Sequence, residues 1–199
     1  MLPFGQSRRQ FGKLLATGQL TSYGSGTGVD DGAFRKGIVK SYTVLTLGQY
    51  SGTTNIVVNS KTDAHSNNCV FDNNTGLMWS RTKAASVGPA SNGLLPWTTN
   101  ANGEGIFAYC AAANAALLAG YSDWRIPSLN GLLSLMCYEA PKILFDSTAF
   151  PVMSGNIRSA TTYPADTTKA MYINSLNSTD TYIYYAVKTG TMSCILVRG

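Results

Sequence analysis

Two aromatic-anchored stretches constrain the fold of this chain more than any other feature of its sequence. Residues 72–79 read Asp-Asn-Asn-Thr-Gly-Leu-Met-Trp, and residues 121–127 read Tyr-Ser-Asp-Trp-Arg-Ile-Pro. The first stretch predicts a β-hairpin turn, with Gly76 at a position that needs a positive φ. The second follows the clearest helical segment. Neither has the residue pairing of a catalytic site, so both predict a small mixed α/β scaffold that displays loops.

The remaining local patterns place strands on both sides of two helices. Segments rich in β-branched and aromatic residues, separated by glycine, asparagine or proline, are typical of short strands. We expect residues 48–52 to form the turn of a hairpin that joins the first two of these strands. The predicted strands cover residues 38–47, 54–59, 69–72, 77–80, 157–162, 170–175, 182–188 and 192–197.

Two segments between these strands predict helices. Alanine dominates residues 104–119, and Gly120 ends this helix. Ser128 is a suitable N-cap for a second helix over 129–138. Strands, two helices and strands again are typical of an α+β domain with an antiparallel sheet, rather than of alternating βαβ units.

The composition limits the classes of function that suit the chain. Only 13% of the residues are charged, and the polar surface comes from serine, threonine, asparagine and glycine, as in extracellular and virion-surface proteins. The net charge is +5, but the tightest basic group, Arg8, Arg9 and Lys13, lacks an aromatic stacking ladder. We therefore expect no nucleic-acid binding. No apolar run is long enough for membrane insertion, and a secretory signal is absent or already removed.

The cysteines and the single histidine do not indicate a metal site. Cys69, Cys110, Cys137 and Cys194 form no Cys-x-x-Cys pair, and His65 lies in a loop rich in serine and asparagine. A structural zinc site needs closely spaced ligands, so none is expected. The thiols are either free and buried or joined in long-range disulfides, and the lack of an export signal favours free thiols.

Several short segments along the chain together have the pattern of one known family. They are residues 17–19, 30–32, 72–79, 108–110, 120–128, 159–162, 170–174 and 194–199. With these segments the chain resembles the Lcl C-terminal domain family, a C-type-lectin-like group of bacterial surface proteins and phages, from about residue 17 to the end. The chain departs from the family pattern at Gly131, where a glutamate is common, at Arg158, where a tryptophan is usual, and at Ala160, where a serine is usual.

The resemblance implies a C-type-lectin-like fold with two helices and a small, twisted antiparallel sheet. On this interpretation residues 1–37 form an N-terminal arm with a Gly-rich turn segment. Residues 38–68 form a β-hairpin insertion for attachment or oligomerisation, and residues 69–199 form the C-type-lectin-like domain. The resemblance also implies that Cys110 and Cys194 are neighbours in space.

The motif residues have structural roles in this interpretation. Trp79 and Trp124 fill the core, and Asp123 and Arg125 lock the turn between the helices through a charge-assisted hydrogen bond. The Glu-Pro-Asn and Trp-Asn-Asp strings of calcium-dependent lectins are absent, so we expect no lectin-type calcium site. Oxidases with this fold need a close reactive cysteine pair, which nothing assigns here. We therefore expect no enzymatic activity, no catalytic residue, no metal and no cofactor.

The candidate binding surface lies within residues 153–192. Tyrosine and asparagine combine rigid contact area with adaptable hydrogen bonding, which suits recognition of a sugar or a protein surface. The alternating tyrosines at 182–185 are equally consistent with a strand that is half core and half surface. The candidate ligand-binding residues are Asn156, Arg158, Tyr163, Asn174, Asn177, Tyr182 and Tyr184.

These observations predict a non-enzymatic virion-surface protein of a bacteriophage, assembled in the host cytoplasm and placed on a tail fibre, a tail tip or the head. The N-terminal arm and the hairpin over 38–59 would bind other virion proteins or join protomers, and the lectin-like domain would bind a host-surface glycan or protein. A homo-oligomer, with a trimer as one option, would add avidity. The alternatives are a capsid or tail decoration protein without a host ligand, and a secreted bacterial adhesin.

Overall fold

The computed structural model describes most of the chain beyond residue 36. Most of the predicted arm, the predicted turn at 48–52, His65, Asn177 and Tyr182 lie outside the described residues. No helix in the described part is long and apolar enough to span a membrane. The described residues are 37–45, 55–64, 69–85, 87–90, 92–139, 142–151, 155–174 and 183–199, together with 15, 16, 19, 22, 30, 33 and 153.

A four-stranded antiparallel sheet contains the hairpin predicted around residues 72–79. In this hairpin Val70 lies opposite Trp79. The amide of Gly76 donates to the Asp72 carbonyl over 2.9 Å, and Gly76 has a φ of 76°. The predicted turn and its positive φ are therefore confirmed. The order of the sheet is β1 (Tyr42–Leu45), β4 (Cys69–Asp72), β5 (Met78–Ser80) and β13 (Val197–Arg198).

The predicted hairpin over residues 38–59 is wrong, because β1 pairs with β4. The next strand, β2 (Asn55–Val58), instead forms a hairpin with β3 (Lys61–Ala64). The two residues between them, Asn59 and Ser60, have φ values of 47° and 60°. A two-residue turn with positive φ at both positions matches the twist of the flanking strands, which favours this local pairing.

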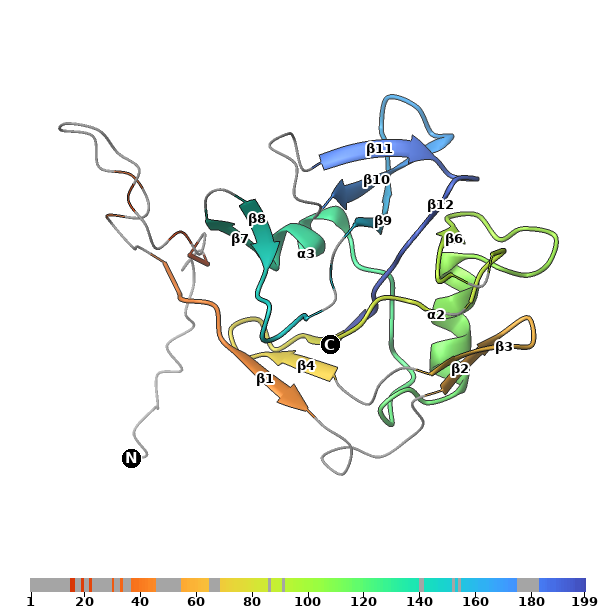
Figure 1. Cartoon of the computed structure of the whole chain (residues 1–199), viewed down its shortest axis with the longest axis horizontal. Coiled ribbons are helices and arrows are strands. Elements are labelled where there is room, and N and C mark those ends of the chain that lie inside the picture. Colours follow the sequence, from red (N-terminus) through yellow and green to blue (C-terminus); the bar gives the residue numbers. More distant parts are fainter. Residues whose placement is uncertain are drawn as a thin grey trace, which may run out of the picture.

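The first helix is shorter than predicted. Helix α2 spans Ile106–Ala115, and the chain leaves it through Leu117 and Gly120, with φ values of 53° and 85°. Its buried side chains include Tyr109 and Ala113. Helix α2 packs against β2, and Figure 1 shows the β2–β3 hairpin beside it.

The second helix begins where predicted but ends early. Helix α3 spans Leu129–Ser134, and the Ser128 hydroxyl accepts a hydrogen bond from the Gly131 amide over 3.2 Å, which confirms the N-cap. The predicted continuation to residue 138 is wrong, because β7 (Met136–Glu139) pairs with β8 (Lys142–Phe145). A helix this short has little stability of its own, so strand pairing of the following residues prevails.

A second, three-stranded antiparallel sheet carries most of the candidate binding residues. Its order is β11 (Ile183–Val187), β10 (Lys169–Asn174) and β9 (Asn156–Thr162). A short antiparallel pair, β12 (Thr191–Met192) and β6 (Leu95–Pro96), adjoins this sheet, because β12 contacts β9. The predicted strand at 192–197 is thus divided between β12 and β13. In the described part of the chain, two helices and small antiparallel sheets give the α+β class that the sequence predicts.

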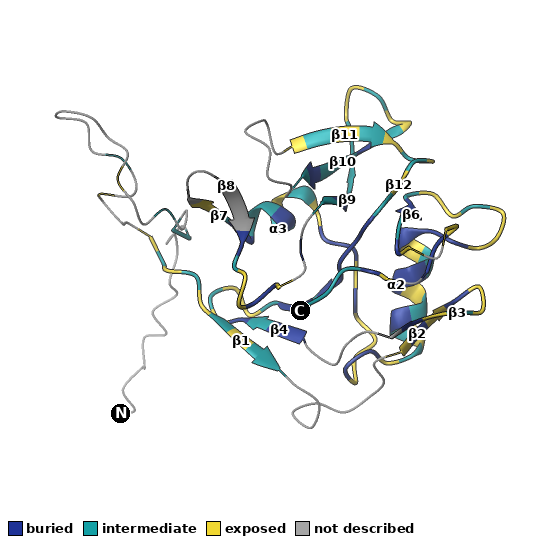
Figure 2. Cartoon of the chain, in the orientation of Figure 1, coloured by how far each residue is buried: buried dark blue, intermediate teal, exposed yellow. Residues whose placement is uncertain are grey.

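Both aromatic motifs anchor the core. Trp79 is fully buried in a cluster with α3 residues and Ile157, and Trp124 is buried in a second cluster with α2 residues. The Trp124 indole donates to the carbonyl of Leu118 over 2.8 Å. Figure 2 shows buried residues in dark blue on α2 and along the segment that leads to the C-terminus. The core roles predicted for the two tryptophans agree with these positions.

The predicted lock between Asp123 and Arg125 is wrong. The Asp123 carboxylate instead accepts from Arg198 Nε over 2.6 Å. The backbone of Arg125 pairs with Val197, at 2.8 and 2.9 Å, and this antiparallel bridge brings Arg198 to Asp123. The motif is therefore held by the end of the chain rather than within its own turn.

Candidate binding surface

One side of the β9–β10–β11 sheet brings four predicted residues together. Residues directly opposite each other in an antiparallel sheet project from the same face. Tyr172 lies opposite both Tyr184 and Arg158, and Asn174 lies opposite Asn156. We call Asn156, Tyr172, Asn174 and Tyr184 the tyrosine–asparagine face. Tyr172 was not among the predicted candidates, although its alternation with Ile173 could have indicated it.

The two tyrosines form the aromatic part of this face. The ring centroids of Tyr172 and Tyr184 are 5.6 Å apart, with an angle of 22° between the ring planes. Both residues are half-buried. Burial, and then the neighbouring Tyr184, raises the pKa of Tyr172, so its phenol stays neutral and can both donate and accept a hydrogen bond. The pair therefore offers ring surface together with neutral hydroxyl groups.

Arg158 was predicted to contact a ligand, but it is 0% exposed. Its Nη2 donates to the Gly190 carbonyl over 2.9 Å, and its Nη1 donates to the Ala186 carbonyl over 3.2 Å. Burial lowers the pKa of Arg158, yet a guanidinium keeps its charge in proteins. The peptide carbonyls that surround it explain why it is buried. Arg158 thus holds β11 and the following turn in place instead of reaching a surface ligand.

The two asparagines complete the face. Asn174 and Asn156 are both half-buried and lie opposite each other at one end of β10. The Oδ1 atom of Asn156 is buried and has no hydrogen-bond partner within the described part of the chain. A buried polar atom without a partner is unusual in a folded protein and needs a specific explanation. An incoming hydrogen-bond donor at this end of the face is one such explanation.

Tyr163 does not join this face. Its ring stacks on Tyr185, with centroids 4.0 Å apart and an angle of 9°. Tyr185 alternates with Tyr184 along β11 and therefore projects to the opposite side of the sheet. Lys169 lies 5.2 Å from the centre of the Tyr185 ring and pairs with Asp166 over 3.1 Å. The structure thus separates Tyr163 from the other candidate residues.

The cysteines of the described structure are free thiols. Cys110 and Cys194 belong to the same core cluster, and burial followed by the neighbouring Cys110 raises the pKa of Cys194. The Cys110 thiol donates to the Trp124 carbonyl over 3.1 Å, and burial raises its pKa to about 11. The two residues are therefore neighbours, as the resemblance implies, without a disulfide. Buried thiols with raised pKa values are poor nucleophiles.

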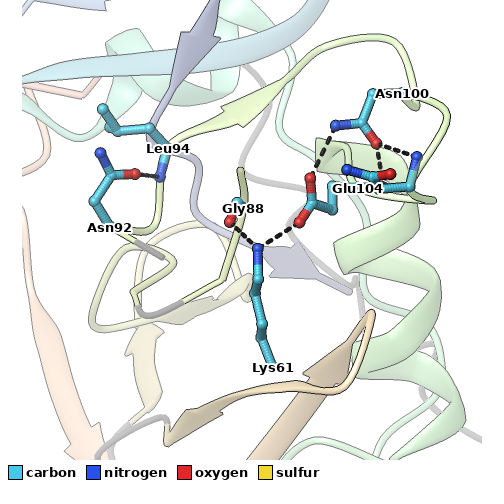
Figure 3. Close-up of polar contacts among 7 residues, drawn as sticks. Lys61, Gly88, Asn92, Leu94, Asn100 and Glu104 are labelled. Carbon is cyan, nitrogen blue, oxygen red and sulfur yellow. Dashed lines mark hydrogen bonds and ion pairs between the residues drawn. The ribbon is translucent and has the colours of Figure 1, made fainter. Parts of the chain in front are cut away.

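A second polar cluster joins the β2–β3 hairpin to the loop before α2. The buried Glu104 carboxylate is 2.6 Å from Lys61 Nζ and accepts from the Asn100 amide over 2.9 Å. Figure 3 shows the Lys61 ammonium between Glu104 and the Gly88 carbonyl. The Asn100 hydrogen bond, followed by the one from Lys61, lowers the pKa of Glu104. Both carboxylate oxygens of Glu104 are engaged, so this cluster anchors the β2–β3 hairpin to the loop before α2.

Asp63 attaches the same hairpin to helix α2. Its buried carboxylate accepts from the Tyr109 hydroxyl over 2.8 Å and from the Ala85 amide over 3.0 Å. Within the described ranges, no group of three or more histidine, cysteine, aspartate or glutamate side chains is placed to hold a metal ion. The two hydrogen bonds to Asp63 connect the β2–β3 hairpin with α2 and with the segment at Ala85.

Comparison with known proteins identifies the family. The sequence model of the Lcl C-terminal domain matches residues 68–198, which is more than half of the chain. The chain therefore belongs to the Lcl C-terminal domain family. No curated protein and no solved structure matches it. The strands β1, β2 and β3 precede the matched region, although they pair or pack with its elements.

Proposed function

Starting from this family membership, we propose that the chain is a non-enzymatic surface protein of a bacteriophage particle that recognises a host-surface molecule. On this proposal residues 69–199 have a C-type-lectin-like fold, and the tyrosine–asparagine face is the recognition surface. The observation that carries the proposal is the gathering of Asn156, Tyr172, Asn174 and Tyr184 on one side of a sheet.

The chemistry of this face suits a glycan or a polar protein surface. Tyrosine rings pack against the apolar face of a sugar or an aliphatic side chain, while the hydroxyl groups exchange hydrogen bonds at the rim. Asparagine amides both donate and accept. Arg158 fixes three carbonyls around the end of β11, at 2.9 to 3.3 Å, so the face is held before a ligand arrives. Such preorganisation reduces the entropy lost on binding.

The buried ionisable groups support a binding role over a catalytic one. The carboxylates of Glu104 and Asp63 each accept two hydrogen bonds from neighbouring segments. Burial raises the pKa of Cys69 to about 12 and that of Cys110 to about 11, which disfavours a thiolate nucleophile. A catalytic acid or base needs a pKa near the working pH and access to substrate.

The proposed location on a virion rests on the composition and on the N-terminal segment. Only 13% of residues are charged, and serine, threonine, asparagine and glycine supply much of the polar composition, which suits a virion surface. We propose that the arm of residues 1–37 binds other virion proteins and that a homo-oligomer multiplies weak host contacts.

Binding of the labelled full chain to intact host bacteria, measured by flow cytometry, tests the recognition role. Tyr184→Ala should weaken binding by about tenfold or more, because it removes one ring of the aromatic pair. A tenfold change in Kd corresponds to roughly 1.4 kcal/mol of binding free energy. Tyr138→Ala is the control, since Tyr138 is a tyrosine with 38% exposure that lies away from this sheet, on β7. Equal binding by the wild type and Tyr184→Ala would exclude this face as the recognition surface.

A decoration protein that binds only its virion neighbours is the second candidate. The exposed apolar side chains of Val39 and Val57, near β1 and on β2, favour such a contact. Immunogold labelling of intact particles with antibody against residues 153–199 separates the two. Label at a tail tip or fibre supports host recognition, and regular label over the head supports decoration. An absence of label from all particles would contradict both and favour a bacterial adhesin.

A further inference from the structure

Strand β9 of the binding sheet carries a bulge next to the tyrosine–asparagine face. On one side of the bulge Thr162 lies opposite Ala170. On the other side Arg158 lies opposite Tyr172. Between these two pairs β10 contributes a single residue, whereas β9 contributes residues 159–161. Bulges of this kind are common next to functional sites, where they change the direction of side chains.

The bulge decides which residues meet on the tyrosine–asparagine face. If the pairing of Thr162 with Ala170 continued along both strands without a bulge, Asn174 would lie opposite Arg158. In the structure Asn174 lies opposite Asn156 instead, because β9 has more residues than β10 within the bulge. The bulge therefore brings the two asparagines of the face together.

The Ser159 hydroxyl connects the two strands within the bulge. It donates to the Met171 carbonyl on β10 over 2.8 Å and accepts from the Thr161 amide over 3.1 Å. Ser159 is 0% exposed. A bulge disrupts the regular ladder of backbone hydrogen bonds, and buried backbone groups need other partners. One side chain thus provides a partner for a carbonyl and for an amide at this irregular point.

The second aromatic motif of the sequence holds the same bulge from another side. The Pro127 carbonyl accepts from the Ala160 amide over 2.8 Å. The Leu129 amide donates to the Thr161 hydroxyl over 3.0 Å. These contacts lie where the motif at 121–127 leads into α3. The motif is therefore connected to the recognition sheet, although none of its residues belongs to the tyrosine–asparagine face.

We propose that Ser159 is a positioning residue of the tyrosine–asparagine face: its hydroxyl fixes the bulge that sets Asn156 opposite Asn174. This inference rests on the proposed recognition role of the face. Without the hydroxyl, the Met171 carbonyl and the Thr161 amide each lose a partner, which is costly for buried groups. The bulge then loosens, the two asparagines move apart, and the face no longer fits its ligand.

Ser80→Ala is a matched control for Ser159→Ala. The Ser80 hydroxyl is also buried and also makes two hydrogen bonds, because it donates to the Thr82 carbonyl and accepts from the Leu196 amide. Ser80 lies on β5, in the four-stranded sheet. A general loss of stability should therefore be similar in the two variants, and only Ser159→Ala should alter the recognition face.

NMR spectroscopy of the full chain measures the register without any ligand. The cross-strand nuclear Overhauser effect between backbone protons of Asn156 and Asn174 should weaken in Ser159→Ala and stay unchanged in Ser80→Ala. An unchanged effect in Ser159→Ala, or an equal loss in both variants, would overturn the proposal. If circular dichroism shows that Ser159→Ala is unfolded, Thr161→Val takes its place with the same expected result, because it removes only the hydroxyl that Leu129 contacts.

Binding to host bacteria, measured by flow cytometry, gives the functional readout. Ser159→Ala should bind more weakly than the wild type by about fivefold or more, and Ser80→Ala should bind like the wild type. Equal binding by Ser159→Ala and the wild type would contradict the positioning role. A wild type that binds no host cell would refute the proposed function instead, and the NMR comparison would still decide whether Ser159 sets the register.

Discussion

Replacing Ile56 by alanine tests whether the strands before the family match belong to the core. Ile56 on β2 is 0% exposed and belongs to the cluster that contains α2 and Trp124. The substitution removes three carbon groups, worth about 2.4 kcal/mol at ~0.8 kcal/mol each. The remaining cavity adds to this, and buried isoleucine-to-alanine changes cost about 2–5 kcal/mol. We expect a loss of about 3–4 kcal/mol in the free energy of unfolding.

Urea denaturation and a thermal melt of the full chain measure this loss. At roughly 2–4 °C per kcal/mol for a chain of this size, the Tm should fall by roughly 6–16 °C. Val57→Ala is the control, because Val57 is the next residue in the same strand and is 54% exposed. It should change the unfolding free energy by less than about 0.5 kcal/mol. If Ile56→Ala were as mild as Val57→Ala, the hairpin would be an independent appendage and the packing argument would be refuted.

Two further substitutions test local features of the fold. Ser128→Ala should cost about 1 kcal/mol in urea denaturation, because it removes the N-cap bond of α3, and an unchanged midpoint would argue against that cap. The hydrogen bond from Asn100, and then the one from Lys61, lowers the pKa of Glu104 in the folded protein. Glu104 therefore makes its full contribution to the free energy of unfolding above its unfolded pKa of about 4.3. This contribution is lost as the pH falls through the lower folded pKa. Acid titration of the unfolding free energy should therefore be less steep for Glu104→Gln than for the wild type below about pH 4.3, and identical slopes would contradict the anchor role.

Features that depend on neighbouring residues could be predicted from the sequence. The hairpin around Gly76 and the cap at Ser128 follow from turn and capping chemistry within a few residues. The burial of Trp79 and Trp124 follows from their size and apolar character. Both tryptophans occupy the core, as expected for aromatic anchors of a small domain.

Features that depend on residues far apart in the chain could not be predicted from the sequence. The partner of Asp123 is Arg198, 75 residues away, and a nearer arginine at 125 was the more obvious candidate. β1 pairs with β4 because the short turn at Asn59 already commits β2 to β3. Sequence spacing alone does not show which strands that lie far apart in the chain will be adjacent.

Arg158 shows the same limit within the candidate site. An arginine in a strand rich in serine and threonine predicts an exposed ligand contact. Its burial depends on the carbonyls of Ala186 and Gly190, which only the folded β10–β11 hairpin and its following turn bring into reach. The site residues that share a face, by contrast, follow from strand alternation once the pairing is known.

Hydrogen–deuterium exchange of the full chain, with and without a cell-envelope fraction of the host, tests the central claim most directly. It locates the bound surface without changing any residue. The account predicts that the fraction slows amide exchange in peptides that cover β9, β10 and β11, residues 156–187, with little change in residues 55–64. Protection confined to residues 37–64, or no protection at all, would contradict recognition through the tyrosine–asparagine face.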